Sequence, residues 1–152
     1  MGTRTNTLIS EIVFHTIMKG TYLLEVYLKE NTNICIGKLG WRRFPKGFYF
    51  YVGSALNGLE KRIHRHMDPH KKIHWHIDYF LNHAIIKSIY YQESTKKTEC
   101  FIAETFKKTC QSIQGFGCSD CSCESHLFTG SLSQFTSVMN RLGMKKYINA
   151  KS

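Results

Sequence analysis

The chain has 152 residues, of which 42% are hydrophobic and 13% aromatic. This composition excludes a disordered chain, and the length fits one globular domain. Lys and Arg outnumber Asp and Glu by 21 to 11, and the resulting formal net charge of +10 indicates a polyanionic partner, either nucleic acid or an anionic membrane surface.

A membrane partner is not expected, because the apolar runs are far shorter than the roughly 20 residues of a spanning helix. The first residues also lack the pattern of a signal peptide. We therefore expect a cytoplasmic protein whose six cysteines are reduced, and are either buried or bound to a metal ion.

Apolar periodicity predicts an α/β (α+β) fold in which a small, mainly antiparallel sheet is flanked by helices. A basic loop leads to the third strand, and Asn57 is expected to cap the first helix together with Glu60. Strands are expected at 21–28, at 34–36 as the returning strand of a hairpin, and at 48–52 and 84–91; helices are expected at 58–67, 73–82 and 98–108. Residues 1–19 are assigned to an N-terminal extension, residues 20–128 to the domain, and residues 129–152 to a polar, basic tail.

Two tyrosines on different strands form the first candidate for a functional site. Tyr22 lies on the first expected strand and Tyr51 on the third, and antiparallel pairing would bring both phenols to one edge of the sheet. Arg62 and His66 are four residues apart and share one helix face. An arginine can clamp a phosphate and its developing charge, and Tyr or His can relay the proton of an attacking water. Each residue alone has a structural explanation, as strand packing or a solvated helix face, but the combination is specific.

Glu99 is a further candidate, because it shares a helical stripe with Ile102, Ala103 and Phe106 and should point inward. A buried carboxylate needs a partner, and a hard cation such as Mg²⁺ is suitable. The alternative is an acidic residue favoured by the dipole at the start of a helix.

The segments Tyr51-Val52-Gly53-Ser54-Ala55, Leu59-Glu60-Lys61-Arg62 and Arg65-His66 resemble the core of the GIY-YIG endonucleases. That class includes phage intron homing enzymes and the incision subunit of bacterial nucleotide excision repair. The resemblance implies a hydrolase that cleaves DNA phosphodiester bonds, in DNA repair or recombination, with one Mg²⁺ or Mn²⁺ ion held by a glutamate of a later helix. Carried over residue by residue, the catalytic set is Tyr22, Tyr51, Arg62, His66 and Glu99, with Glu99 as the metal ligand.

A narrower resemblance covers residues 20–128. The segments Lys72–Tyr79, Gly115–Gly117, Ser119–Cys123 and Ser125–Phe128 are similar to an uncharacterised archaeal and bacterial GIY-YIG branch, sometimes fused to endonuclease III-type glycosylases. The interval between Tyr22 and Tyr51 is longer than is usual in the class, and a basic insertion around Arg42 and Arg43 fills it. The asparagine that often closes the class's site has its nearest counterpart in Ser119 or Asp120.

Cysteines crowd a segment near the end of the expected domain. Cys118, Cys121, Cys123 and His126 are candidate zinc ligands. Zinc sites usually draw on two separated ligand pairs, whereas these four residues lie within nine positions, so Zn²⁺ at Cys121, Cys123 and His126 is the less favoured interpretation. The alternative is a polar brace of Asp120 and His126 beside the active site. His74 and Asp78, four residues apart, could pair on the second helix.

Basic residues are concentrated between Lys38 and Lys72, where nine Lys or Arg face two acidic residues. DNA is therefore the expected partner, with DNA repair proteins as a further class of partner and a monomer or weak dimer as the assembly. Two alternatives stay open: a DNA-binding accessory module with an idle site, and a small zinc-stabilised interaction protein. The expected DNA contacts are Lys38, Arg42, Arg43, Lys46, Lys61, Arg65, Lys71 and Lys72.

Overall fold

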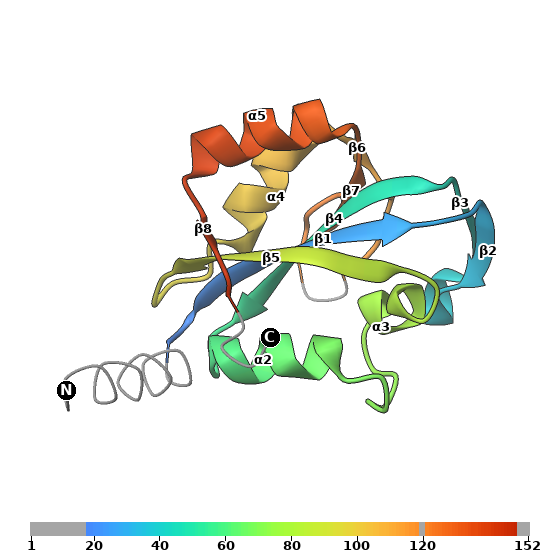
Figure 1. Ribbon diagram of the computed structural model, residues 1–152, viewed down its shortest axis with the longest axis horizontal. Helices are drawn as coiled ribbons and strands as arrows, with labels where there is room; N and C mark the ends of the chain where they lie inside the picture. The colour runs from blue at the N-terminus through green and yellow to red at the C-terminus, as the bar shows by residue number, and fades with distance from the viewer. Residues whose placement is uncertain (1–17, 119–120, 149–152) are drawn as a thin grey trace, which may run out of the picture.

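The computed structural model describes residues 18–118 and 121–148. In these residues six strands form one antiparallel sheet in the order β6-β7-β4-β1-β5-β8, and β2 and β3 form a second, two-stranded sheet (Figure 1). The strands are β1 (Gly20–Leu28), β2 (Thr32–Cys35), β3 (Trp41–Phe44), β4 (Gly47–Ala55), β5 (Ile85–Glu93), β6 (Gln111–Ser112), β7 (Leu127–Thr129) and β8 (Lys145–Lys146). The helices are η1 (Gly37–Leu39), α2 (Leu59–Met67), α3 (His76–Leu81), α4 (Glu99–Lys107) and α5 (Leu132–Leu142). The expected α+β architecture is confirmed.

Helices cover both faces of the central sheet, with α2 and α3 on one side and α4 and α5 on the other (Figure 1). Successive side chains of a strand point to opposite faces, and β1 is buried on both. Tyr22, Leu24, Val26 and Leu28 join the core beneath α2 and α3. Leu23 joins a second core against α4 and α5, which also holds Phe50, Val52, Ile102, Phe106, Phe128, Phe135 and Val138. The start of α4 and the middle of α2 are thereby held against the same two central strands.

The hairpin expected between residues 21–28 and 34–36 is wrong. β1 pairs with β4 on one side and with β5 on the other, each over most of its length. Both edges of β1 are therefore taken by strands of nine residues, and the short β2 pairs with β3 instead. The expected basic loop is in part this strand β3, which carries Arg42 and Arg43 beside a largely exposed Trp41.

The range expected to be a basic tail also needs correction. Residues 132–146 form α5, which buries Phe135 and Val138, and β8, which pairs with β5. A capping box between Ser131 and Gln134 starts α5, and Gly143, with φ of 63°, ends it. The core therefore extends past residue 128. Residues 1–17 and 149–152 lie outside the described residues.

Two helix starts differ from the expectation. Gly58, and not Asn57, occupies the cap position of α2, and no side chain caps that helix. The second helix begins at His76 and not at Ile73, because the Asp78 carboxylate accepts the backbone N–H groups of His74 and Trp75 and holds these residues as an extended entry. These differences leave the order of elements unchanged.

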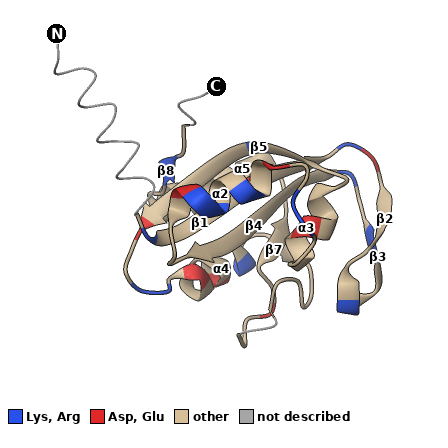
Figure 2. Cartoon of the chain, turned by 90° about the horizontal axis from the view of Figure 1, so that it is seen from below, with Lys and Arg blue, Asp and Glu red and all other residues tan. Residues whose placement is uncertain are grey.

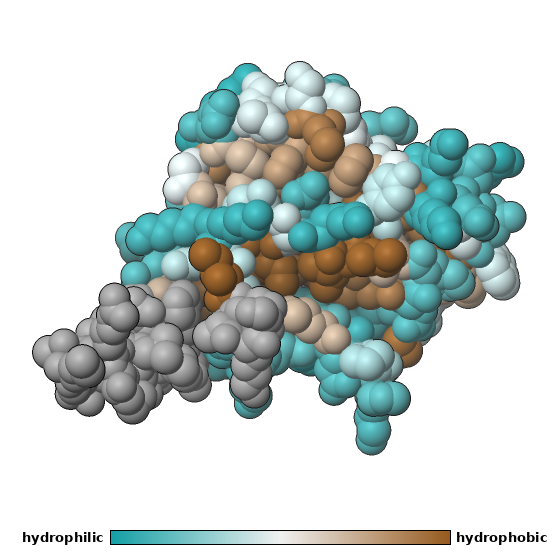
Figure 3. Space-filling model, in the orientation of Figure 1, coloured by the Kyte–Doolittle hydropathy of each residue, from teal (hydrophilic) through white to brown (hydrophobic). Residues whose placement is uncertain are grey.

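Apolar side chains also gather along one side of β5 (Figure 3). There, Leu81, Ala84, Ile86 and Ile89 help to line a groove of about 490 Å³.

Among the described residues, no helix has the length and apolar character that crossing a bilayer requires.

Candidate active site

A cavity of about 510 Å³ lies where β1, β4, α2, the entry to α3 and the start of α4 meet. Four of the five predicted catalytic residues line it: Tyr22, Tyr51, Arg62 and Glu99. The fifth, His66, lies behind Tyr22. Each of the four comes from a different element, so the fold, and not one local motif, assembles the cavity wall.

The two tyrosines lie side by side on neighbouring strands. Tyr22 of β1 is in register with Gly53 of β4, and the ring centroids of Tyr22 and Tyr51 are 6.4 Å apart. A Cβ atom at Gly53 would collide with the Tyr22 ring. The glycine therefore lets that ring cross the neighbouring strand and carry its hydroxyl to α2.

The Tyr22 hydroxyl oxygen lies 2.5 Å from Nε2 of His66, at hydrogen-bond distance. The pKa of His66 is lowered to about 3, mainly by burial; Asp78 opposes this effect, and Arg65, Arg62 and Lys71 add to it. Burial also raises the pKa of the Tyr22 phenol well above its ordinary value. At neutral pH the contact thus joins a neutral imidazole and a protonated phenol.

The buried His66 should make the domain sensitive to acid. Its folded pKa of about 3 lies below the ordinary value of 6.5, so the unfolded chain takes up the proton first as the pH falls below 6.5. The contribution to stability is complete above pH 6.5 and decreases steadily toward pH 3. We expect the free energy of unfolding to fall by about 3 kcal/mol between pH 7 and pH 4 through this residue, measured by denaturant titration.

The matched control for this acid effect is His64, on the same helix and exposed to solvent. His66→Gln should flatten the decline of stability with falling pH, whereas His64→Gln should retain it. His76 and His126 are also held below their ordinary pKa by burial, so a smaller slope should persist in both variants. Equal slopes in the two variants would show that His66 does not cause the effect.

Trp75 holds the two arginines of α2. The guanidinium of Arg62 lies 4.3 Å from the centre of a Trp75 ring, and that of Arg65 lies 4.1 Å from it. The positive charge of Arg62 also opposes the rise of the Tyr22 pKa. Arg62 is therefore fixed at the cavity wall with its charge next to both phenols.

Arg65 has a different role from the DNA contact expected for it. Its guanidinium donates two hydrogen bonds to the fully buried Asp78, at 3.0 and 2.9 Å, and one to the Lys72 carbonyl. Burial raises the pKa of Asp78, but the bonds from Arg65 and from the Trp75 and His74 backbones outweigh it and lower that pKa overall. The pair expected on the second helix is not formed as predicted, because His74 lies before α3 and only its backbone N–H donates to Asp78. This network holds Trp75, and through it Arg62.

Glu99 is the first residue of α4 and is half-buried at the cavity. Thr98, just before it, lies 2.7 Å from Thr21 between hydroxyl oxygens, which ties the start of α4 to β1 beside Tyr22. Burial raises the pKa of Tyr51, and the negative charge of Glu99 raises it further while Arg62 opposes it. Glu99 is the only carboxylate among the described lining residues.

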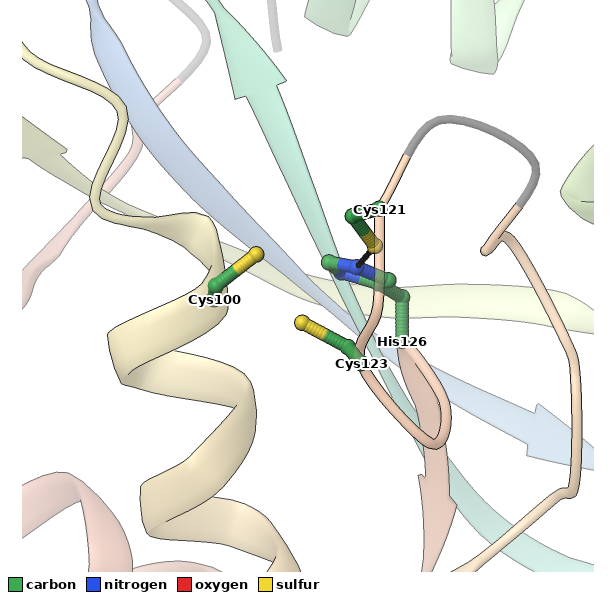
Figure 4. Close-up of side chains that lie close together, drawn as sticks. All are labelled: Cys100, Cys121, Cys123 and His126. Atoms are coloured by element: carbon green, nitrogen blue, oxygen red, sulfur yellow. Dashed lines mark hydrogen bonds between the residues drawn. The ribbon is translucent and has the colours of Figure 1, made fainter.

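Cysteines lie next to this cavity. The ligand atoms of Cys100, Cys121, Cys123 and His126 all lie within 4.8 Å of one another (Figure 4), so the four could hold a metal ion such as zinc. The set corrects the expected one, because Cys100 of α4 takes the place of Cys118. The Cys118 thiol instead donates to the Phe116 carbonyl. Ser119 and Asp120, and with them the expected Asp120–His126 brace, lie outside the described residues.

A family model described as "Domain of unknown function DUF123" matches residues 21–146. The chain belongs to this family. Searches of curated proteins and of solved structures return no match. The matched range contains the whole cavity wall and the cysteine cluster, so both are features of the DUF123 domain itself.

The residues predicted to contact DNA lie outside the cavity wall, on α2, in the segment after α2 and around the β2–β3 sheet (Figure 2). Arg42 donates to the Gln114 carbonyl, and Lys71 donates to the carbonyls of His66 and Asp68. Those that are exposed are Lys38, Arg43, Lys46, Lys61 and Lys72. The sequence prediction missed Lys97, which lines the cavity with Arg62, and it missed Trp75 and Cys100; only their positions in the fold reveal them.

Proposed function

We propose that this DUF123 domain is a metal-dependent endonuclease that hydrolyses DNA phosphodiester bonds. The observation that carries the proposal is the meeting of Tyr22, Tyr51, Arg62 and Glu99, from four elements, in one cavity. Two phenols, a guanidinium and one carboxylate match the needs of a phosphodiester, which requires a clamp for its oxygens and a route for the proton of the attacking water. The resemblance to GIY-YIG endonucleases supports the same residues.

Arg62 would bind the phosphate, because its planar guanidinium is already oriented by stacking on Trp75. Such a preoriented donor stabilises charge that develops on the phosphate oxygens without rearranging during the reaction. Glu99 would hold a Mg²⁺ or Mn²⁺ ion, which supplies stabilisation of the leaving oxygen when bound.

The proton of the attacking water would leave through a tyrosine, which accepts it at the phenol oxygen while its own hydroxyl proton passes to solvent in the cavity. The Tyr22 hydroxyl is in hydrogen-bond contact with Nε2 of His66, so His66 would fix that hydroxyl in place. With its pKa held at about 3, His66 stays neutral and would not keep the proton. Tyr51, whose pKa is raised in part by the charge of Glu99, would orient the water.

DNA would approach along the basic residues outside the cavity. Phosphate contacts supply most of the affinity of proteins for DNA, and the exposed cations of α2 and of the β2–β3 sheet flank the site (Figure 2). Lys97 at the cavity wall would contact the phosphate next to the one cleaved.

The test is a nicking assay with purified protein on supercoiled, duplex, branched and single-stranded DNA, with Mg²⁺ or Mn²⁺ and with a chelator. We expect metal-dependent cleavage of at least one substrate. Tyr51→Phe should lower the rate by about 10²-fold, at the lower end of general acid–base effects, and leave stability nearly unchanged, because the ring stays in place.

Tyr49→Phe is the matched control, because Tyr49 lies two residues earlier on β4 and its hydroxyl donates to the Pro45 carbonyl. This variant should cleave like the parent. An absence of cleavage on all substrates, combined with salt-sensitive DNA binding, would favour the idle accessory module over the endonuclease.

A further inference from the structure

We propose that Cys100, Cys121, Cys123 and His126 form a tetrahedral zinc site that joins α4 to the segment before β7. The thiols and the imidazole converge on one small space from two parts of the chain that are far apart in sequence (Figure 4). Cys100 lies on the first turn of α4, and the other three residues lie in the segment that leads into β7.

The spacing of the four ligand atoms is close to that of a zinc site. With Zn–S bonds of about 2.3 Å and a Zn–N bond of about 2.0–2.1 Å, tetrahedral geometry places sulfurs about 3.8 Å apart and sulfur and nitrogen about 3.6 Å apart. Here the atoms all lie within 4.8 Å of one another, and Cys121 Sγ is 3.1 Å from His126 Nε2. Side-chain shifts of about 1 Å would complete the tetrahedron, on that same geometry.

The ligand types select zinc over the ion proposed for Glu99. Thiolates and imidazole favour Zn²⁺, whereas Mg²⁺ takes oxygen ligands. All four positions are filled by side chains, as in structural and not catalytic zinc sites. The cysteine cluster and Glu99 thus favour different ions, although Cys121 and His126 also line the cavity that contains Glu99.

A zinc ion at this place would fix Glu99. Cys100 is the next residue along α4, while the backbone carbonyl of His126 accepts the N–H of Val52, next to Tyr51 on β4. The ion would thus connect the element that carries Glu99 to the strand that carries Tyr51. Backbone hydrogen bonds already tie the segment before β7 to β4 and to residues 113–116, and the ion would add a link from this segment to α4. This positioning role rests on the proposed function, whereas the zinc site itself does not.

The first measurement is the metal content of the full chain, purified under reducing conditions and then incubated with zinc and desalted. We expect one zinc ion per chain. Cys100→Ser should bind none after the same treatment, whereas Cys118→Ser should retain the full equivalent. These two variants separate the cluster of the fold from the set expected from the sequence. A folded parent without zinc, or loss of zinc from Cys118→Ser but not from Cys100→Ser, would overturn the site.

Co²⁺ in place of zinc tests the ligand set in the parent protein, so this measurement does not depend on whether a variant folds. The parent loaded with Co²⁺ should show d–d bands of a tetrahedral ion and thiolate-to-metal charge transfer with the intensity of three Co–S bonds. An octahedral spectrum, or one without charge transfer, would contradict the ligand set.

The positioning role has its own readout. Cys100→Ser should cleave DNA about 10²-fold more slowly than Cys118→Ser, as expected when a reacting group is displaced by about 1 Å. Equal cleavage by the two variants, with zinc lost only from Cys100→Ser, would leave a structural site and refute the positioning of Glu99. Zinc content is measured without DNA, so failure of the zinc site and failure of the endonuclease proposal are distinguishable.

Discussion

Glu99→Gln should lower the rate of metal-dependent cleavage by roughly 10³-fold at a fixed Mg²⁺ concentration. The change keeps the shape of the side chain but removes the only carboxylate among the described residues that line the cavity. A bound cation contributes several kcal/mol of charge stabilisation, and about 4 kcal/mol corresponds to about 10³ in rate. Because the metal site is weakened and its surroundings stay intact, high Mn²⁺ should restore part of the activity.

The control for this prediction is Glu104→Gln, on the same helix but exposed to solvent. It removes the same charge from α4 and should cleave like the parent. Single-turnover rates over a range of metal concentrations would measure both variants. If Glu99→Gln and Glu104→Gln cleave equally, Glu99 does not hold the ion and the proposed metal site is wrong.

The positions of the central strands could be predicted from the sequence, because their apolar residues are continuous and the helices after them have clear apolar periodicity. The strands that pair with β1 could not be predicted in this way. A short turn after Leu28 favours a hairpin with the next apolar segment, but the longer β4 and β5 bury more of the β1 edges. Which strands pair with β1 depends on all the strands of the sheet, and the local spacing of residues does not determine it.

Helix α5 could have been predicted from the sequence. Ser131 and Gln134 have the spacing of a capping box, and Gly143 has the place of a C-cap. The basic residues of this range favoured the prediction of a tail. Phe135 and Val138, three residues apart on α5, form its buried face.

The structure brings Tyr22, Tyr51, Arg62 and Glu99 to one cavity, and each of them lies on a strand or helix that could be predicted from the sequence. Cys100 and Trp75 were missed for the opposite reason. A lone cysteine on a helix carries no signal until α4 packs beside the segment before β7. Trp75 matters only because Asp78 and Arg65 hold its loop against α2.

Arg62→Ala should reduce the cleavage rate by about 10²–10³-fold, the usual cost of losing one preoriented donor to a developing charge. The free energy of unfolding should change by only about 1 kcal/mol, because the stacking on Trp75 is a modest interaction. Arg62→Lys should recover little, since a lysine cannot make two parallel hydrogen bonds to a phosphate. The matched control is Lys61→Ala, which removes the neighbouring exposed charge and should weaken DNA binding slightly without changing the rate at saturating DNA. If Arg62→Ala and Lys61→Ala alter only the DNA affinity, and by the same amount, then Arg62 is a surface contact and the cavity is not where the phosphodiester reacts.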